Sequence, residues 1–187
     1  ELPKGKITLL HFFIYEMPMN EEGKKWLAVL GRVPELESMF FHKNPGTMPM
    51  EVLRGLTKVK SLSLKPTAVD DAAFAHLAGL KSLEKLAISY MCQQFTGTGL
   101  GYINENLLEF ETDSKTISAE GLAYLPRFKK LRRLDLTGSA VTDAMLQGLA
   151  ALQDLEALEV TDTKLDGSFL AFLPANSKVR WLSLGRM

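Results

Sequence analysis

The chain has 187 residues, of which 46% are hydrophobic, enough to bury one substantial core or a row of small stacked units. Its 22 Lys and Arg residues balance its 22 Asp and Glu residues. The chain therefore lacks the overall positive field that draws proteins to nucleic-acid phosphates or to anionic lipid, and the composition disfavours both kinds of partner.

Cysteine content and apolar run lengths exclude further classes. Cys92 is the only cysteine, so an intramolecular disulfide and a Cys-rich zinc site of the usual spacing cannot form. No apolar run approaches the roughly 18–20 residues that span a bilayer, and residues 1–4 show neither an initiator Met nor a signal-peptide pattern. We expect a soluble chain in which residue 1 is a processed end or an internal position of a longer protein, and the compartment stays open.

A six-residue pattern with apolar residues at its first, fourth and sixth positions recurs along the chain and predicts a short strand in each copy. The copies are Ile7–Phe12, Leu36–Phe41, Val59–Leu64, Leu83–Ile88, Glu105–Phe110, Leu131–Leu136, Leu155–Val160 and Val179–Leu184. Their fourth residues, from Leu10 through Leu108 in the fifth copy to Leu182, lie 22 to 29 residues apart. The fifth copy is irregular, because Glu105 stands where an apolar residue is expected.

Between the predicted strands the apolar spacing becomes helical. In Val141–Leu152 apolar residues fall at spacings of 3 and 5, as one face of a short helix requires, and Val69–Leu80 repeats the pattern. Residues whose side-chain oxygens suit a helix N-cap stand near the expected helix starts. These are Asp70, Ser118, Thr142 and Asp166. Each unit is therefore predicted to run strand, turn, helix and return.

One such unit cannot cover its own apolar residues, so its neighbours must do so. Stacked units place successive strands in parallel about 4.8 Å apart, with the helices on the outer side. We expect Leu62, Leu86, Leu134 and Leu158 to line up in adjacent strands and the sheet to form a concave surface.

The sequence resembles the leucine-rich repeat superfamily, in particular its ribonuclease-inhibitor-like and bacterial types. The resemblance rests on Leu-x-x-Leu-x-Leu at Leu131–Leu136, followed by Val141-Thr142-Asp143 and a helix pattern. It is strong over 59–88 and 131–184, and weaker over 1–49 and 91–105.

This resemblance implies an α/β fold: a right-handed leucine-rich repeat solenoid, or horseshoe, of about eight repeats with a parallel inner sheet and outer helices. It implies one domain over residues 1–187, with irregular repeats at about 1–58 and regular repeats at about 59–187. Members of this superfamily bind unrelated partners on their concave faces, and the resemblance supplies no catalytic residue.

Side chains between the apolar positions are expected to face the concave surface. The predicted middle column is His11, Phe40, Ser63, Ala87, Glu109, Asp135, Glu159 and Ser183. Glu109, Asp135 and Glu159 would then lie on consecutive strands, with Glu111 beside them, and such a stripe suits a basic partner segment. The alternative is that Lys85 and Arg133, in the adjoining column, neutralise the stripe.

The two ends of the predicted groove offer further candidates. Leu9, Phe13 and Phe40 gather with His11 and His42 at the N-terminal end, either as an interface or beneath a cap or the loop at 17–26.

At the C-terminal end, Trp181 is expected to face outward on the last strand. The sequence stops within that strand, whose edge would be continued by a further segment or would pair with a second copy.

The sequence contains only weak matches to motifs for cofactor binding, metal binding or catalysis. In the run Gly97-x-Gly99-x-Gly101, Tyr102 stands at the place of the third glycine of a dinucleotide-binding turn, and the three histidines form no His-x-x-x-His pair. Carboxylates such as Glu109 and Asp135 on an open sheet would not be shielded from water.

The sequence therefore predicts no cofactor, no metal and no enzymatic activity. It predicts a non-catalytic scaffold that binds a protein or peptide on its concave face. The alternative is a self-associating structural or spacer module of a larger protein, joined through the C-terminal edge.

Overall fold

The computed structural model describes residues 9–12, 25, 29, 33, 35–41, 50–64, 69–89 and 94–185, the first four by their backbone alone. Within these residues the chain forms one eight-stranded parallel sheet in the order β1-β2-β3-β4-β5-β6-β7-β8. The strands are β1 (Leu9–Phe12), β2 (Ser38–Phe41), β3 (Ser61–Leu64), β4 (Lys85–Ile88), β5 (Glu109–Thr112), β6 (Arg133–Asp135), β7 (Ala157–Glu159) and β8 (Trp181–Ser183). Strand order thus follows chain order throughout, as a solenoid requires.

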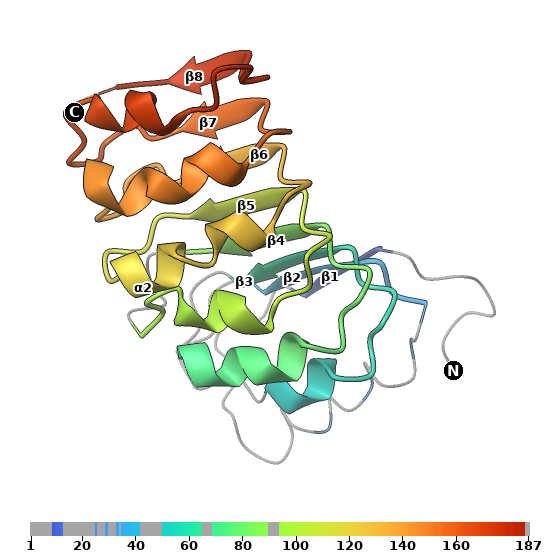
Figure 1. Ribbon diagram of the computed structural model, residues 1–187. Helices are drawn as coiled ribbons and strands as arrows, with labels where there is room; N and C mark the ends of the chain where they lie inside the picture. The colour runs from blue at the N-terminus through green and yellow to red at the C-terminus, as the bar shows by residue number, and fades with distance from the viewer. Residues whose placement is uncertain are drawn as a thin grey trace.

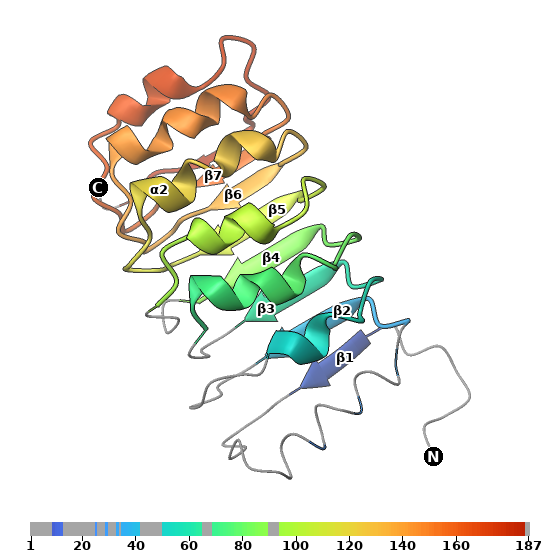
Figure 2. The ribbon, with the colours of Figure 1, turned by 60° about the horizontal axis from the view of Figure 1, so that its bottom comes forward.

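Short helices lie along the opposite side of the sheet (Figures 1 and 2). They are η2 (Met50–Leu53), η3 (Asp71–Leu77), η4 (Thr98–Tyr102), α2 (Ala119–Leu122), η5 (Leu125–Arg127), η6 (Asp143–Ala151) and η7 (Ser168–Phe172). Only α2 is an α-helix among them, whereas the others are 3-10 helices. A 3-10 helix rises about 2.0 Å per residue against about 1.5 Å for an α-helix, so it crosses the outer side with fewer residues.

The predicted alignment of leucines is confirmed. Leu62 lies opposite Leu86, and Leu134 lies opposite Leu158, in the register of neighbouring strands. All four side chains are at most 1% exposed and belong to one row of the core, in which β5 contributes the residue between Leu86 and Leu134.

In the fifth copy of the six-residue pattern, the predicted alignment with the neighbouring strands is wrong by two residues. Phe110, not Leu108, lies opposite Leu86 and Leu134. Phe110 is 1% exposed and Leu107 is fully buried, whereas Leu108 is only half-buried. The corrected positions 86, 110 and 134 are 24 residues apart on both sides. Thr112, 1% exposed, fills the last core position of this strand, which is why the apolar pattern misled.

The helix starts match the predicted caps in part. Asp70 accepts a hydrogen bond from the Ala73 N–H at 2.9 Å, and the Ser118 hydroxyl accepts one from the Gly121 N–H at 3.1 Å. Thr142 is the N-cap of η6 but its side chain makes no capping bond.

The fourth predicted cap is displaced by one residue. Gly167, with φ of 96°, is the N-cap of η7, and Asp166 precedes it. Asp166 still accepts a hydrogen bond from the Ser168 N–H at 2.9 Å, so its side chain stabilises the same turn.

Two aspartates, each at the start of an outer helix, bind the backbone of the next repeat: Asp71 of η3 and Asp143 of η6. Asp143 accepts hydrogen bonds from the backbone N–H groups of Asp166 at 2.9 Å and Phe169 at 2.8 Å. Asp71 does the same at an earlier repeat, where it accepts from the Gly99 N–H at 2.6 Å. These carboxylates supply partners for amides that the short helices leave free at their starts.

Candidate functional site

The outward-pointing side chains of β2–β8 form the sheet face, which carries two neighbouring rows defined by strand register. The middle row is Phe40, Ser63, Ala87, Glu111, Asp135, Glu159 and Ser183. The flanking row is Ser38, Ser61, Lys85, Glu109, Arg133, Ala157 and Trp181.

The predicted place of Glu109 in the middle row is therefore wrong. Glu109 lies in the flanking row between Lys85 and Arg133, and Glu111 takes its place next to Asp135. The cause is the two-residue error at Leu108, because a shift of two keeps a side chain on the same face of the sheet while moving it along the strand. A stripe of three carboxylates on consecutive strands is present, with Glu111 as its first member.

The cations of the flanking row form ion pairs with Glu109 and with two members of this stripe. Lys85 Nζ lies 2.6 Å from Glu109, and Arg133 Nη2 lies 2.7 Å from Glu159 and 3.3 Å from Asp135. The side chain of Glu111 is exposed and makes no hydrogen bond or ion pair within the described chain. The neutralisation that the sequence left as an alternative is thus partial.

The environment of Arg133 reflects this crowding. Desolvation alone would lower the pKa of its guanidinium. The carboxylates of Glu159, Asp135, Glu109 and Glu111 outweigh that effect and raise the pKa above its usual value. Four carboxylates and the two cations Lys85 and Arg133 leave this cluster with a net charge of −2 at neutral pH.

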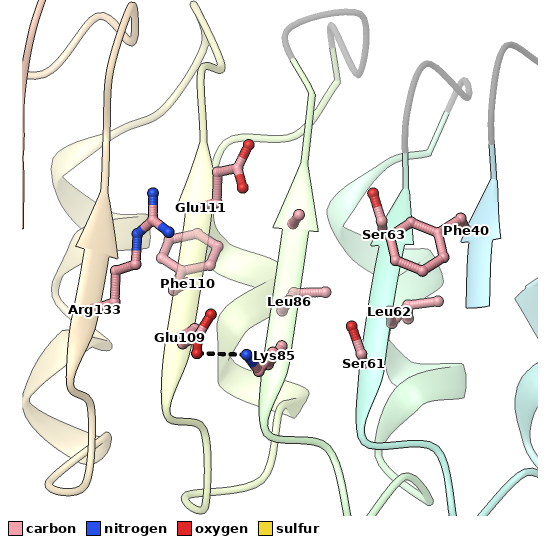
Figure 3. A pocket seen from close by; sticks show the side chains of 11 residues that line it. Phe40, Ser61, Leu62, Ser63, Lys85, Leu86, Glu109, Phe110, Glu111 and Arg133 are labelled. Atoms are coloured by element: carbon pink, nitrogen blue, oxygen red, sulfur yellow. Dashed lines mark ion pairs between the residues drawn. The ribbon is translucent and has the colours of Figure 1, made fainter. Parts of the chain in front are cut away.

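A hollow of about 170 Å³ opens on the sheet face over β2–β6 (Figure 3). Its middle is lined by the small side chains of Ser61, Ser63 and Ala87 on β3 and β4. Phe40, 37% exposed, lines one end, and the charged side chains of β4–β6 line the other. The hollow exists because, in the middle row, β3 and β4 carry the small residues Ser63 and Ala87 between Phe40 on β2 and Glu111 on β5.

Three of the other predicted site residues, Asp135, Glu159 and Trp181, do not line this hollow. Trp181 is 62% exposed and ends the flanking row on β8. His11 lies opposite Phe40 in the register of β1 and β2. Phe13 and His42 lie outside the described residues, and only the backbone of Leu9 and His11 is described, so the proposed apolar cluster at the N-terminal end stays a prediction.

Sequence reasoning placed Ser63 and Ala87 in the middle column but did not recognise them as site residues. Small side chains were overlooked because they carry no charge and no aromatic ring. The signal that could have found them is two short outward residues on consecutive strands next to a bulky neighbour.

The glycine run is explained by packing. Gly97 has φ of 95°, a left-handed conformation, and forms the N-cap of η4. A Cβ at Gly99 would lie 2.8 Å from the ring of Phe74, and one at Gly121 would lie 2.6 Å from Gly97 Cα. Close approach of neighbouring repeats accounts for these glycines.

In the described part of the chain, no group of three or more His, Cys, Asp or Glu residues could hold a metal ion. None of the helices described is long and apolar enough to cross a bilayer.

Known structures share this fold. Internalin C2 from Listeria monocytogenes strain 4b F2365 matches with a TM-score of 0.60 and 24% identity, over 84% of this chain and 67% of its own. The leucine-rich repeat ectodomain of the Arabidopsis thaliana receptor kinase GASSHO1/SCHENGEN3, solved in complex with Casparian strip integrity factor 2, matches with a TM-score of 0.56 and 18% identity. That match covers 85% of this chain and 19% of the ectodomain.

A third match, at a TM-score of 0.56 and 16% identity, is to an octameric complex of Latrophilin 3, Unc5D and the leucine-rich repeat region of FLRT2. It covers 84% of this chain and 55% of the matched one. No family model matches the sequence, and no curated protein is significantly similar to it.

The chain has the leucine-rich repeat fold, as the sequence pattern indicated. It is an α/β solenoid with one open parallel sheet, and its match spans between 19% and 67% of these three chains.

Proposed function

We propose that this chain is a non-catalytic module that binds a protein or peptide on its sheet face. The observation that carries the proposal is the hollow over β2–β6, which combines a partly exposed aromatic ring, Phe40, with an exposed carboxylate, Glu111, on one open surface. Exposed apolar groups beside charged ones are typical of binding surfaces. Two structures of similar fold are complexes with other proteins, which adds support.

Selection of peptides from a random display library on the immobilised chain tests this proposal. The selected peptides would be measured against a variant of the middle row in which Glu111, Asp135 and Glu159 are each replaced by Lys. We expect this triple variant to bind them at least about tenfold more weakly, because charge reversal at an interface is strongly unfavourable.

A matched control carries the same change of charge away from the sheet face, at Glu51, Glu105 and Glu120, which are all exposed. The control should bind the selected peptides like the unaltered chain. Equal binding to all three proteins, or no enrichment of any peptide, would count against binding on the sheet face.

A second candidate function is self-association through the edge of β8. Leu182 and Leu184 are 40% and 39% exposed, whereas their counterparts on β7, Leu158 and Val160, are fully buried. An exposed strand edge with apolar side chains favours pairing with another strand. Light scattering over a range of concentrations tests this candidate, and a monomer at every concentration would reject it.

A further inference from the structure

The hollow has a defined order along the middle row. Phe40, Ser63, Ala87 and Glu111 lie opposite one another on four consecutive strands, β2 to β5. Ser63 is only 4% exposed, so its small side chain forms part of the floor. The row therefore presents an aromatic ring, then two small residues, then a carboxylate. Phe40, Ser63 and Glu111 of this row are seen in Figure 3.

The spacing of this row matches an extended peptide. Three strand intervals of about 4.8 Å separate Phe40 from Glu111, a span on the order of 14 Å. An extended peptide rises about 3.4 Å per residue, so two of its side chains four residues apart are separated by nearly the same distance. Both also point to the same side of the peptide. A segment that crosses the strands could therefore place them at the two ends of the hollow.

The charges around the hollow favour a cation at the Glu111 end. Lys85 is held by Glu109 at 2.6 Å, and Arg133 is held by Glu159 at 2.7 Å. Both local cations are thus committed to carboxylates other than Glu111, and the cluster keeps its net negative charge. A Lys or Arg from a partner would complete the pairing, because an opposite charge within a few ångströms stabilises a carboxylate.

The opposite end favours an apolar group. Phe40 exposes 37% of its surface, and the methyl group of Ala87 lines the space between Phe40 and Glu111. An apolar side chain placed here would bury its own surface together with part of the Phe40 ring, at roughly 25 cal/mol for each Å² removed from water. One end of the row thus favours an apolar side chain, and the other end favours a cationic one.

We propose that the partner is an extended peptide segment that crosses β2–β5. It carries an apolar side chain against Phe40 and, four residues away in either direction, a Lys or Arg paired with Glu111. This inference rests on the proposed function, and it names the chemistry of the partner at that same face.

The probe is a synthetic fluorescent peptide with one Leu and one Lys four residues apart in a neutral Ser and Gly background. Matched peptides replace Lys by Gln, replace Lys by Glu, replace Leu by Ser, or separate the two residues by three. Fluorescence anisotropy with the whole chain should show binding of the parent peptide weakened about three- to tenfold by each change. No binding of the parent at about 1 mM protein overturns the inference.

Two variants of the chain test whether the peptide binds at the hollow. Glu111→Gln should abolish the preference for Lys over Gln, whereas the exposed control Glu51→Gln should leave it intact. Ala87→Phe should fill the hollow and weaken binding of the parent peptide, with an unchanged circular dichroism spectrum showing that the chain is still folded.

The same variants distinguish a failure of this peptide model from a failure of binding on the sheet face. If library-selected peptides lose binding to the triple Lys variant but are indifferent to Glu111→Gln and Ala87→Phe, binding on the sheet face stands and this inference is wrong. Stronger binding of the Glu peptide than of the Lys peptide would also overturn it, because Lys85 and Arg133 would then be the groups that bind.

Discussion

The guanidinium of Arg133 on β6 lies 2.7 Å from the carboxylate of Glu159 on the next strand. It also lies 3.3 Å from Asp135 on its own strand. One cation thus holds two members of a carboxylate stripe whose third member is Glu111. Like charges on neighbouring strands repel one another, so Arg133 relieves repulsion as well as forming ion pairs.

Replacement of Arg133 by Gln should expose that repulsion. The Arg133 side chain is 46% exposed, and ion pairs at such sites contribute about 0–1 kcal/mol, so we expect a loss of stability within that range at low salt. At about 1 M NaCl the screening length falls to about 3 Å, and the loss should largely disappear. Urea unfolding at the two salt concentrations measures this difference.

Adding Glu111→Gln to Arg133→Gln supplies the control. The double variant should regain part of the stability at low salt, because two carboxylates repel less than three do. A loss that is the same at both salt concentrations would mean that packing of the Arg133 stem, not charge, is what the substitution removes.

Asp143 predicts a pH dependence of folding. Burial opposes ionisation of its carboxyl and is the largest single influence. The hydrogen bonds from the Asp166 and Phe169 amides and from Ser168 together outweigh burial and lower the pKa of Asp143. A carboxyl with a lowered pKa in the folded state stabilises the fold above its unfolded pKa of about 3.9, and this contribution is lost as pH falls through the folded value.

Asp143→Asn should therefore destabilise the chain by about 1–2 kcal/mol at pH 7, since the amide can accept at only one of the two positions. The difference from the unaltered chain should shrink below about pH 4 and vanish when Asp143 is protonated. Chemical denaturation across pH 2 to 7 measures it, and Glu51→Gln, at an exposed position, is the control. A difference independent of pH would mean that the charge of Asp143 has no part in the effect.

Two glycines predict opposite outcomes for the same substitution. A Cβ at Gly121 would lie 2.3 Å from the Thr96 carbonyl oxygen and 2.6 Å from Gly97 Cα, both backbone atoms of the preceding repeat. Gly121→Ala should force α2 away from that repeat and cost about 1–3 kcal/mol or more. A Cβ at Gly55 would meet nothing within 4 Å, so Gly55→Ala should be neutral or slightly stabilising.

Thermal unfolding of the two variants checks this pair. A shift of the midpoint to lower temperature for Gly121→Ala alone is the expected result. Equal midpoints would show that the two repeats can separate without cost.

The sequence predicted the repeat and its core because the core residues are large, apolar and regularly spaced, as Leu62, Leu86, Leu134 and Leu158 are. It could not predict the register of β5, where adjacent leucines at 107 and 108 both fit an apolar position. The sequence also could not predict which carboxylates Arg133 contacts, because these contacts depend on both the strand register and the side-chain rotamers.

The frame of β5 gives the last prediction. Phe110 is 1% exposed in the core between Leu86 and Leu134, so Phe110→Ala should cost about 3–5 kcal/mol through lost burial and the cavity it leaves. Leu108 is half-buried outside that row, so Leu108→Ala should cost only about 1 kcal/mol. Urea midpoints of both variants decide between the two frames. A larger loss for Leu108→Ala than for Phe110→Ala would restore Leu108 to the core and return Glu109 to the carboxylate stripe, in place of Glu111.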